Sequence, residues 1–240
     1  MAESKAYNMD CMDAMKEFPD KFFDLAVVDP PYGGGGTDTH LHGASDGRFG
    51  NKGSVFEKYR QIKAYRTGAG HNHYDNKITE WDIAPNKEYF EELFRISKEQ
   101  IIWGGNYFDL PPTRCFIVWR KLNIPLEGFS MSPVEYAWTS YNDNAKMFEA
   151  FSSSFSNTEK RFHPTQKPVA LYAWIFKNYA KPGFKILDTH LGSGSSRIAA
   201  YDAGLDFVGY EIDKTYFDLQ EKRFSNHAAQ ENLFLQESFL

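Results

Sequence analysis

One tetrapeptide, Asp29-Pro30-Pro31-Tyr32, combines a carboxylate, a stiff backbone and an aromatic ring directly after an apolar run. An aromatic amine is a poor nucleophile because its lone pair is delocalised into the ring. The Asp29 carboxylate can accept one N–H, and the Pro30 carbonyl, held by the rigid Pro-Pro backbone, can accept another. Two acceptors favour a pyramidal nitrogen whose lone pair points at an incoming methyl group. The ring of Tyr32 can stack on the aromatic ring that carries the amine. The tetrapeptide therefore indicates metal-free amine activation, with a simple turn after a strand as the alternative.

A second segment, Asp188 to Ser196, carries glycines at a predicted strand-to-helix turn. Gly192 and Gly194 would let the backbone approach a ligand closely, and the helix N-terminus offers N–H groups to an anion. Glu211 lies nineteen residues after Gly192, at the end of the next predicted strand. An acidic residue at that position accepts hydrogen bonds from ribose hydroxyls.

Two better-known glycine patterns do not fit this loop. The dinucleotide fingerprint requires a third glycine where this chain has Arg197, and the Gly-Lys-Ser/Thr of the phosphate loop is missing. The loop therefore indicates a nucleoside site without a pyrophosphate. S-adenosylmethionine is such a ligand, because its anionic end is a carboxylate. An ordinary turn with a surface glutamate remains the alternative.

Strands and helices are expected to alternate along most of the chain. The short apolar runs predict strands at 24–29, 100–103, 114–119, 134–138, 184–188 and 207–211. Helical spacing or helix boundary signals predict helices at 86–97, 169–179, 195–202 and 214–223. This alternation predicts an α/β fold whose sheet is mostly parallel with an antiparallel hairpin.

Composition excludes several classes of protein. The 240 residues include two cysteines, which form no CxxC pair, and no apolar run approaches the roughly 20 residues that a membrane helix needs. The polar start of the chain predicts a cytoplasmic protein. Charge is distributed unevenly along the chain, although the net value is only −5. Residues 48–77 carry a charge of +5 and residues 188–240 carry a charge of −5.

Three motifs together resemble the amino-methyltransferases of DNA. They are Asp29 to Tyr32, His163-Pro-Thr-Gln-Lys-Pro168, and Asp188 to Ser196, and their order resembles that of the β group, in which the catalytic motif precedes the cofactor motif. Similar stretches occur at 7–11 and 102–108. The resemblance implies a Rossmann-like, S-adenosylmethionine-dependent methyltransferase fold with permuted motif order. It also implies a single domain, 1–240, with a basic loop inserted at about 33–80.

The resemblance also implies a set of cofactor contacts. Asp10 and Cys11 would lie at the adenine end, and the segment from His163 to Pro168 would lie along the methionine end. The family commonly has Phe where this chain has His190, so that contact differs here. The implied cofactor-binding residues are Asp10, Cys11, Asp29, His163, Thr165, Lys167, Asp188, His190, Gly192, Ser193, Gly194 and Glu211.

The expected DNA-binding surface is the basic segment, residues 48–77. A target amine is inaccessible inside a stacked duplex, so the base must be flipped out onto Asp29, Pro30, Pro31 and Tyr32. The expected phosphate contacts are Arg48, Lys52, Lys58, Arg60, Lys63 and Arg66. Residues 140–160 are too few for a separate recognition domain of at least roughly 50 residues, which leaves a short recognition site, loose selectivity, or help from a homodimer or an accessory subunit. Neither a membrane nor a metal is expected.

The motifs together predict a DNA methyltransferase acting on an exocyclic amine of a flipped base. Adenine N6 is preferred, because Asp in the first position of the tetrapeptide resembles the adenine enzymes more, and cytosine N4 is the close alternative. Methylation of RNA or protein is a weaker alternative, because those enzymes usually place the glycine loop first. A non-catalytic DNA-binding partner is the last, and the intact Asp29, Gly192 and Glu211 argue against it.

Overall fold

The computed structural model describes residues 2–32, 83–127, 132–152 and 161–237, with side chains up to 230. The chain divides into two compact units. The first contains Met1–Pro30 and Asn86–Leu240, and the second is Pro31–Pro85. Of the second unit only residues 31–32 and 83–85 are described, so the basic segment and its six predicted phosphate contacts lie outside the described residues.

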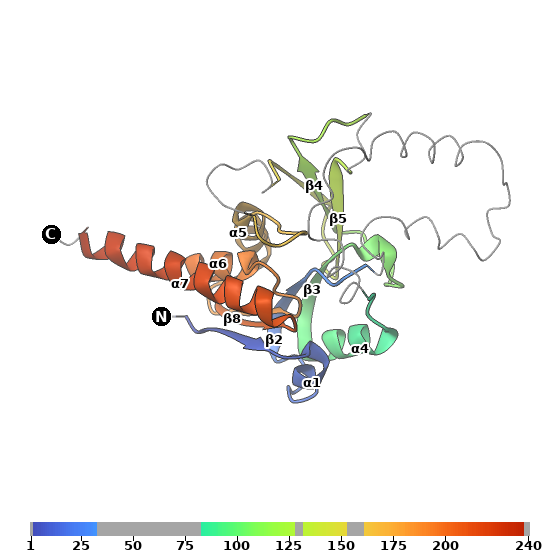
Figure 1. The fold of residues 1–240 in the computed structure, drawn as a ribbon. Helices are drawn as coiled ribbons and strands as arrows, with labels where there is room; N and C mark the ends of the chain where they lie inside the picture. Colours follow the sequence, from blue (N-terminus) through green and yellow to red (C-terminus); the bar gives the residue numbers. More distant parts are fainter. Residues whose placement is uncertain (1, 33–82, 128–131, 153–160, 238–240) are drawn as a thin grey trace. The chain divides into compact units, whose positions relative to one another are not determined.

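The first unit is built on an eight-stranded sheet in the order β1-β8-β7-β2-β3-β5-β4-β6 (Figure 1). The strands are β1 (Ser4–Asn8), β2 (Phe23–Val28), β3 (Ser97–Trp103), β4 (Phe116–Lys121), β5 (Val134–Thr139), β6 (Lys146–Ala150), β7 (Lys185–Asp188) and β8 (Asp206–Glu211). β1, β8, β7, β2 and β3 are parallel, whereas β5 runs antiparallel to β3 and β4. The mostly parallel sheet with an antiparallel pair confirms the expected fold class.

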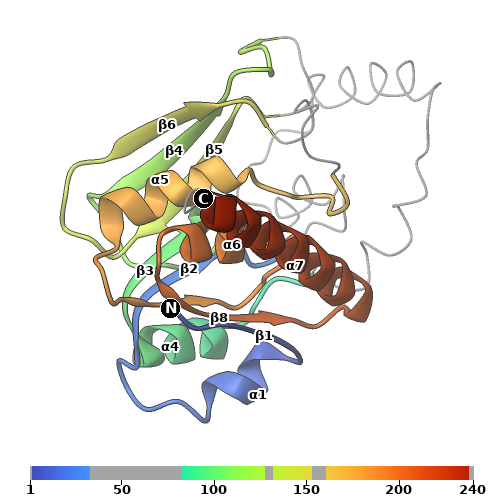
Figure 2. The same cartoon turned by 90° about the vertical axis from the view of Figure 1, so that its left-hand side faces the viewer.

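Helices cover both faces of the sheet (Figure 2). They are α1 (Cys11–Met15), α4 (Lys87–Ile96), α5 (Val169–Tyr179), α6 (Ser195–Asp202) and α7 (Lys214–Glu237), with a short 3-10 turn at Gly105–Tyr107. α5 and α6 pack on one face, and α1 and α4 pack on the other. None of the helices in the described part of the chain is long and apolar enough to cross a membrane.

The central strands contribute side chains to two hydrophobic cores, one on each face of the sheet. On β2, Leu25 and Val27 join the core under α5 and α6, whereas Ala26 and Val28 join the core under α1 and α4. Successive side chains of a strand point to opposite faces, so a strand with helices on both sides must be apolar throughout. This requirement explains why the short apolar run before Asp29 predicts a strand correctly.

The sheet contains two strands that the sequence did not predict. β1 and β6 are the two outermost strands, and most of their residues are exposed or only half-buried. A strand buried on one side or neither carries no apolar run, so its pattern is weak. β6 lies inside residues 140–160, which the sequence analysis treated as a connection after the last core strand. α7 is also longer than the predicted 214–223.

Candidate active site

Four parallel strands bring the predicted carboxylates to one edge of the sheet. Asp29 follows β2, Asp188 ends β7 and Glu211 ends β8, and these strands are consecutive neighbours. β1 pairs with β8 in a register that places Asn8 opposite Glu211, so Asp10 follows at the same edge. Ligands of open α/β sheets bind at the carboxyl ends of the strands. The fold therefore gathers the N-terminal turn, the catalytic tetrapeptide and the cofactor loop.

Glu211 holds two loops by its carboxylate. Its Oε2 accepts a hydrogen bond from the backbone N–H of Gly192 (2.8 Å), and its Oε1 accepts one from Asp213 (2.9 Å). Burial raises the pKa of this carboxyl, and the backbone donors counteract that rise. A carboxylate has about four acceptor positions, so the two oxygens retain capacity for hydroxyl donors. This geometry suits the expected contact with two ribose hydroxyls.

The glycine loop has a conformation that requires its glycines. Gly192 has φ +51° and Gly194 has φ +72°, the left-handed region that side chains disfavour. A Cβ on Gly192 would lie 3.3 Å from the imidazole of His163, and one on Gly194 would lie 3.1 Å from Gln220. The segment from His163 to Pro168 therefore meets the glycine loop directly, as the motif order implied.

The imidazole of His163 is neutral at physiological pH. Burial, together with the positive charges of Lys167 and Arg161, lowers its pKa to about 3. The ring packs edge-on against Tyr216, with centroids 4.4 Å apart, and its Nδ1 lies 3.2 Å from the hydroxyl of Thr165. His163 therefore acts in the structure as a packing residue beside the loop rather than as a charged one.

Arg197 explains why the loop has no third glycine. Its guanidinium donates to Glu221 of α7 (2.5 Å) and to the hydroxyl of Ser4 of β1 (3.1 Å), and it lies 3.9 Å from the ring centroid of Phe224. The side chain thus joins α6 to the first strand and to the last helix. A glycine here would allow a closer helix approach but would lose this connection between the two ends of the chain.

Asp188 is a buried carboxyl at the end of β7. Its Oδ1 accepts a hydrogen bond from the backbone N–H of His190 (3.0 Å), and its Oδ2 accepts one from the hydroxyl of Ser196 (2.5 Å). Burial raises the pKa of Asp188 to about 7. Its contacts span the loop from the strand end to the first turn of α6, so Asp188 fixes the shape of the loop.

We expect Asp188→Asn to stabilise the folded protein at pH 8. The pKa of this carboxyl is raised by folding from 3.8 to about 7, so the folded state binds the extra proton and stability falls as pH rises through this window. Asparagine removes that penalty, which amounts to up to about 4 kcal/mol above pH 7. Thermal unfolding measured from pH 4 to pH 8 should show a flatter profile for the variant. Asp13→Asn, on the exposed side of α1, is the control, and equal slopes for Asp188→Asn and the unsubstituted protein would contradict the prediction.

His190 belongs to a chain of hydrogen-bonded side chains. The hydroxyl of Thr189 lies 2.6 Å from that of Tyr89 and 2.9 Å from Nδ1 of His190, and the His190 ring packs edge-on against Tyr89. Burial lowers the pKa of His190 to about 4, so the ring is neutral. A neutral imidazole can replace the usual phenyl ring as a flat surface, and its contact with the cofactor stays a prediction.

Asp10 and Cys11 begin α1. The Asp10 carboxylate caps the helix by accepting a hydrogen bond from the backbone N–H of Met12 (2.8 Å), which is the usual role of Asp at this position. Cys11 is buried, and burial raises the pKa of its thiol to about 12. Cys11 is therefore a protonated packing residue. Its contact with the adenine end, like that of Asp10, stays a prediction.

Lys167 pairs with two carboxylates. Its Nζ pairs with Oδ2 of Asp29 and lies 3.3 Å from Oε2 of Glu135. The attraction of the two carboxylates outweighs burial and raises the pKa of Lys167, so the ammonium is charged. Lys167 therefore holds the Asp29 carboxylate in this structure, and its contact with the methionine end of the cofactor stays a prediction.

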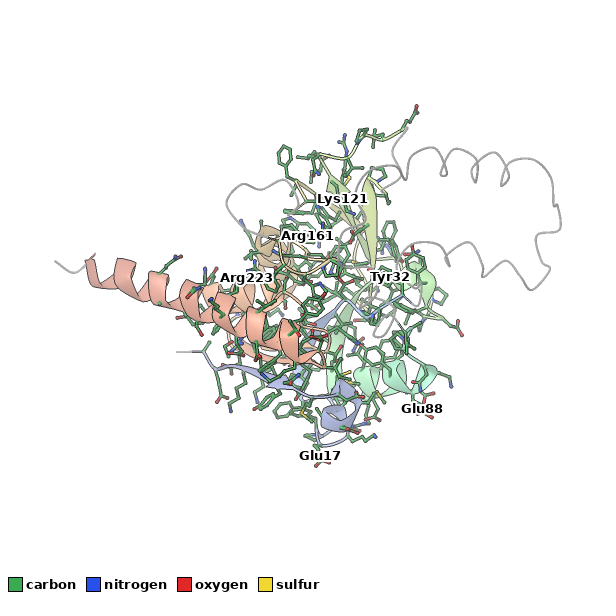
Figure 3. All side chains as sticks on the ribbon, in the orientation of Figure 1. Glu17, Tyr32, Glu88, Lys121, Arg161 and Arg223 are labelled. Atoms are coloured by element: carbon green, nitrogen blue, oxygen red, sulfur yellow. The ribbon has the colours of Figure 1, made fainter. Side chains whose placement is uncertain are left out.

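The sequence analysis missed three charged residues at this edge. Glu135 and Lys121 come from β5 and β4 and pair with each other at 2.6 Å. Arg223 of α7 donates to the carbonyl of Ser193 in the glycine loop (2.7 Å, Figure 3). One signal for Glu135 and Lys121 was available, since each interrupts or ends an apolar run that becomes a core strand.

Groups of three or more His, Cys, Asp or Glu side chains placed to hold a metal do not occur within the described ranges. His71 and His73, which flank Asn72 in the sequence, lie outside those ranges. The described groups at this edge are carboxylates, backbone amides and the ammonium groups of Lys167 and Lys121. Such a set suits hydrogen-bond donors such as amines and hydroxyls.

Comparison with known proteins identifies the class. The sequence profile of the DNA methylase family, whose members modify N6 or N4 amines, matches residues 57–222. Because this match covers well over half of the chain, the protein belongs to that family and is a DNA amino-methyltransferase acting on adenine N6 or cytosine N4.

Individual relatives agree with this assignment. YubD of Escherichia coli (strain K12), provisionally named a methylase, is 23% identical over 236 residues, which cover 90% of this chain and 88% of YubD. The type II methyltransferase M2.LlaDCHI of Lactococcus lactis subsp. cremoris is 30% identical over 91 residues, 37% of this chain and 34% of its own.

Solved structures share the fold. The cytosine-N4-specific PvuII DNA methyltransferase has a TM-score of 0.56 at 11% identity, and the match covers 93% of this chain and 87% of that one. The complex of M1.HpyAVI with SAM has a TM-score of 0.50 at 19% identity, with 93% and 98% covered. The fold is therefore the Rossmann-like methyltransferase fold, as expected.

Proposed function

We propose that this protein methylates the exocyclic amine of a base flipped out of DNA, with adenine N6 as the target and S-adenosylmethionine as the methyl donor. One observation carries the proposal. Asp29 and Pro30 directly follow β2, and the proposed cofactor loop begins at Asp188 at the end of the neighbouring strand β7. An amine acceptor and a nucleoside site thus occupy adjacent positions at one edge of a single sheet.

The residues present fit S-adenosylmethionine. Glu211 presents a buried carboxylate, already oriented by two backbone donors, at the position where a ribose hydroxyl pair is expected. Gly192 and Gly194 have no side chains, so the backbone of the glycine loop is open to a ligand. The neutral ring of His163 lies next to Gly192. No phosphate-binding lysine or third glycine is present in the loop, which agrees with a ligand that lacks a pyrophosphate.

The protein's part in the reaction is orientation and electrostatics. Asp29 accepts one N–H of the target amine and the Pro30 carbonyl accepts the other, which localises the nitrogen lone pair. The cofactor supplies an electrophilic methyl group on a sulfonium. Held by Glu211 and the glycine loop, S-adenosylmethionine would give this methyl group to the amine and would keep the electron pair of the broken carbon–sulfur bond on sulfur, and one proton would leave the methylated amine for water.

Cytosine N4 is the second candidate target. The tetrapeptide of this chain resembles the adenine enzymes more, which favours adenine. The cytosine-N4-specific PvuII enzyme shares the fold at 11% identity. A shared fold is compatible with cytosine N4 as the target but does not favour it over adenine N6. Both targets are exocyclic amines conjugated to a ring, and the same two acceptors serve either.

DNA binding is assigned to the basic segment of a single catalytic domain. Residues 48–77 carry a charge of +5 directly after the catalytic tetrapeptide, so they would neutralise phosphates next to the flipped base. Arg48, Lys52, Lys58, Arg60, Lys63 and Arg66 are the proposed contacts. A second copy of the chain or an accessory subunit would complete a recognition site that this chain keeps short.

The test is methyl transfer from labelled S-adenosylmethionine to DNA, RNA and protein, followed by nucleoside analysis. We expect the label in DNA, as N6-methyladenine. Label in N4-methylcytosine would correct the target base. Label in RNA or protein alone, or in no substrate despite cofactor binding, would refute the proposal, the last result favouring a non-catalytic DNA-binding partner.

A further inference from the structure

Four charged side chains of alternating sign form a row that starts at the catalytic carboxylate. Asp29 pairs with Lys167, Lys167 with Glu135 (3.3 Å), and Glu135 with Lys121 (2.6 Å). They come from the end of β2, from the segment before α5, from β5 and from β4. The row therefore connects the parallel half of the sheet with its antiparallel hairpin.

The row is largely buried. The side chains of Lys167, Lys121 and Asp29 are 4%, 10% and 14% exposed, and that of Glu135 is half-buried at 28%. The Lys167 ammonium lies 5.2 Å from the ring centroid of Trp103, and the Lys121 ammonium lies 5.4 Å from that of Trp119. Buried ions cost desolvation energy, so they are weak contributors to stability unless their charges are fully matched. Here the formal charges sum to zero, and the row ends on a residue that the proposed reaction uses.

We propose that Lys167 and Glu135 are positioning residues for Asp29. Resting on the proposed function, Lys167 holds Oδ2 of Asp29, so that the carboxylate is fixed in place as an acceptor for the target amine. Glu135 holds the ammonium from its other side, and Lys121 neutralises Glu135. None of these three side chains needs to touch the substrate.

The sign of the electrostatics follows from the pairs. A positive neighbour within about 4–6 Å favours the charged form of a carboxylate, and a negative neighbour disfavours it. Lys167 and Lys121 lower the pKa of Glu135 despite its burial, so Glu135 is also ionised. Other titratable groups feel the same row: the negative charge of Asp29 contributes to the raised pKa values of Asp188 and Tyr172.

Lys167→Met is the informative substitution. It removes the charge and keeps the chain length, so kcat should fall by about 100-fold as the carboxylate loses its fixed orientation. The KM for DNA and the Kd for S-adenosylmethionine should change by less than about threefold.

Two further variants separate charge from packing. Lys167→Arg keeps the positive charge and should restore kcat to within about tenfold of the unsubstituted enzyme. Glu135→Gln removes a negative charge from the row, so it should lower kcat through the loosened anchor. A residue that only fills space would not be rescued by charge, so equal kcat values for Lys167→Arg and Lys167→Met would contradict the positioning role.

A control pair exists at the other end of β2. Lys98 of β3 pairs with Asp24 of β2 at 2.7 Å, near the strand starts and away from the carboxyl ends. Lys98→Met also breaks a lysine–aspartate pair, and it should leave kcat, its pH profile and the cofactor Kd unchanged.

Three results would overturn the inference. Lys167→Met with an unaltered kcat and a Kd for S-adenosylmethionine raised more than about tenfold would make Lys167 a cofactor ligand. Lys167→Met that behaves like Lys98→Met would make the row structural. If Lys167→Met does not fold, Glu135→Gln with an unaltered kcat would reject the anchoring role.

An NMR experiment distinguishes this inference from the proposed function. With carboxyl-labelled aspartate, the Asp29 resonance is identified by its loss in Asp29→Asn. At one fixed pH its chemical shift should differ between Lys167→Met and the unsubstituted protein and should stay the same in Lys98→Met, whatever the substrate of the enzyme. An unchanged chemical shift in Lys167→Met would refute the positioning role even if DNA is methylated, whereas a changed shift without DNA methylation would leave the pairing intact and refute only the substrate.

Discussion

Asp29→Asn should reduce methyl transfer to DNA by about 10³-fold or more, the scale on which a lost preorganised hydrogen bond reduces catalysis. The amide keeps the shape of the carboxylate but loses its charge, and its NH₂ group would point at either the target amine or the Lys167 ammonium. Cofactor affinity, measured by calorimetry, should change by less than about threefold, because Glu211 and the glycine loop lie on other strands. Asp29→Ala should have the same effect on transfer and in addition leave Lys167 without its main partner.

The control for Asp29 is on the same strand. Asp24 lies at the start of β2 and pairs with Lys98, at the edge remote from the cofactor loop. Asp24→Asn changes the same chemical group in the same element and should retain full transfer. An Asp29→Asn enzyme that keeps more than about a tenth of the activity would remove Asp29 from the reaction, because such a loss is only about 1.4 kcal/mol.

Glu211→Ala should weaken S-adenosylmethionine binding by roughly 1–3 kcal/mol, the cost of leaving buried polar groups without partners. The structure adds a second consequence, because the backbone N–H groups of Gly192 and Asp213 lose their acceptor at the same time. We therefore expect a lower unfolding temperature together with the lower affinity. Calorimetry measures the affinity and thermal unfolding measures the stability.

Two comparisons assign the effect to the carboxylate itself. Glu211→Gln keeps one acceptor oxygen but turns an NH₂ group toward a backbone donor, so it should lose affinity nearly as Glu211→Ala does. Asp206, at the start of β8, accepts a hydrogen bond from the backbone N–H of Glu3 (2.8 Å), and Asp206→Ala should leave cofactor affinity unchanged. Unaltered affinity in Glu211→Ala would remove Glu211 from the cofactor site.

The central elements could be predicted from sequence because their patterns are strong. The helix 169–179 and the helix 195–202 have the predicted bounds, and the strand before Asp29 agrees to within a residue or so. These elements lie in the interior of the fold, where burial demands continuous apolar runs or a helical apolar face. The outer strands β1 and β6 are not buried on both faces, so they need no continuous apolar run and the sequence pattern did not predict them.

The candidate site divides in the same way. The residue types and their local context determined the tetrapeptide, the glycine loop, Glu211 and the order of the motifs. Local backbone geometry is sufficient for these, since each motif is a strand end followed by a turn. The family match over residues 57–222 agrees with them.

The partners of these residues were decided by the tertiary structure alone. Lys167 is 138 residues from Asp29 in the chain, and only the sheet order brings the segment before α5 to the end of β2. Likewise, Asn8 faces Glu211 because β1 pairs with β8 in a particular register. A sequence pattern reports which face of an element is apolar, but strand order and register set which charges meet. The sequence by itself therefore determined which chemical groups the candidate site contains, and the tertiary structure decided that the Asp29 carboxylate is held by a buried lysine.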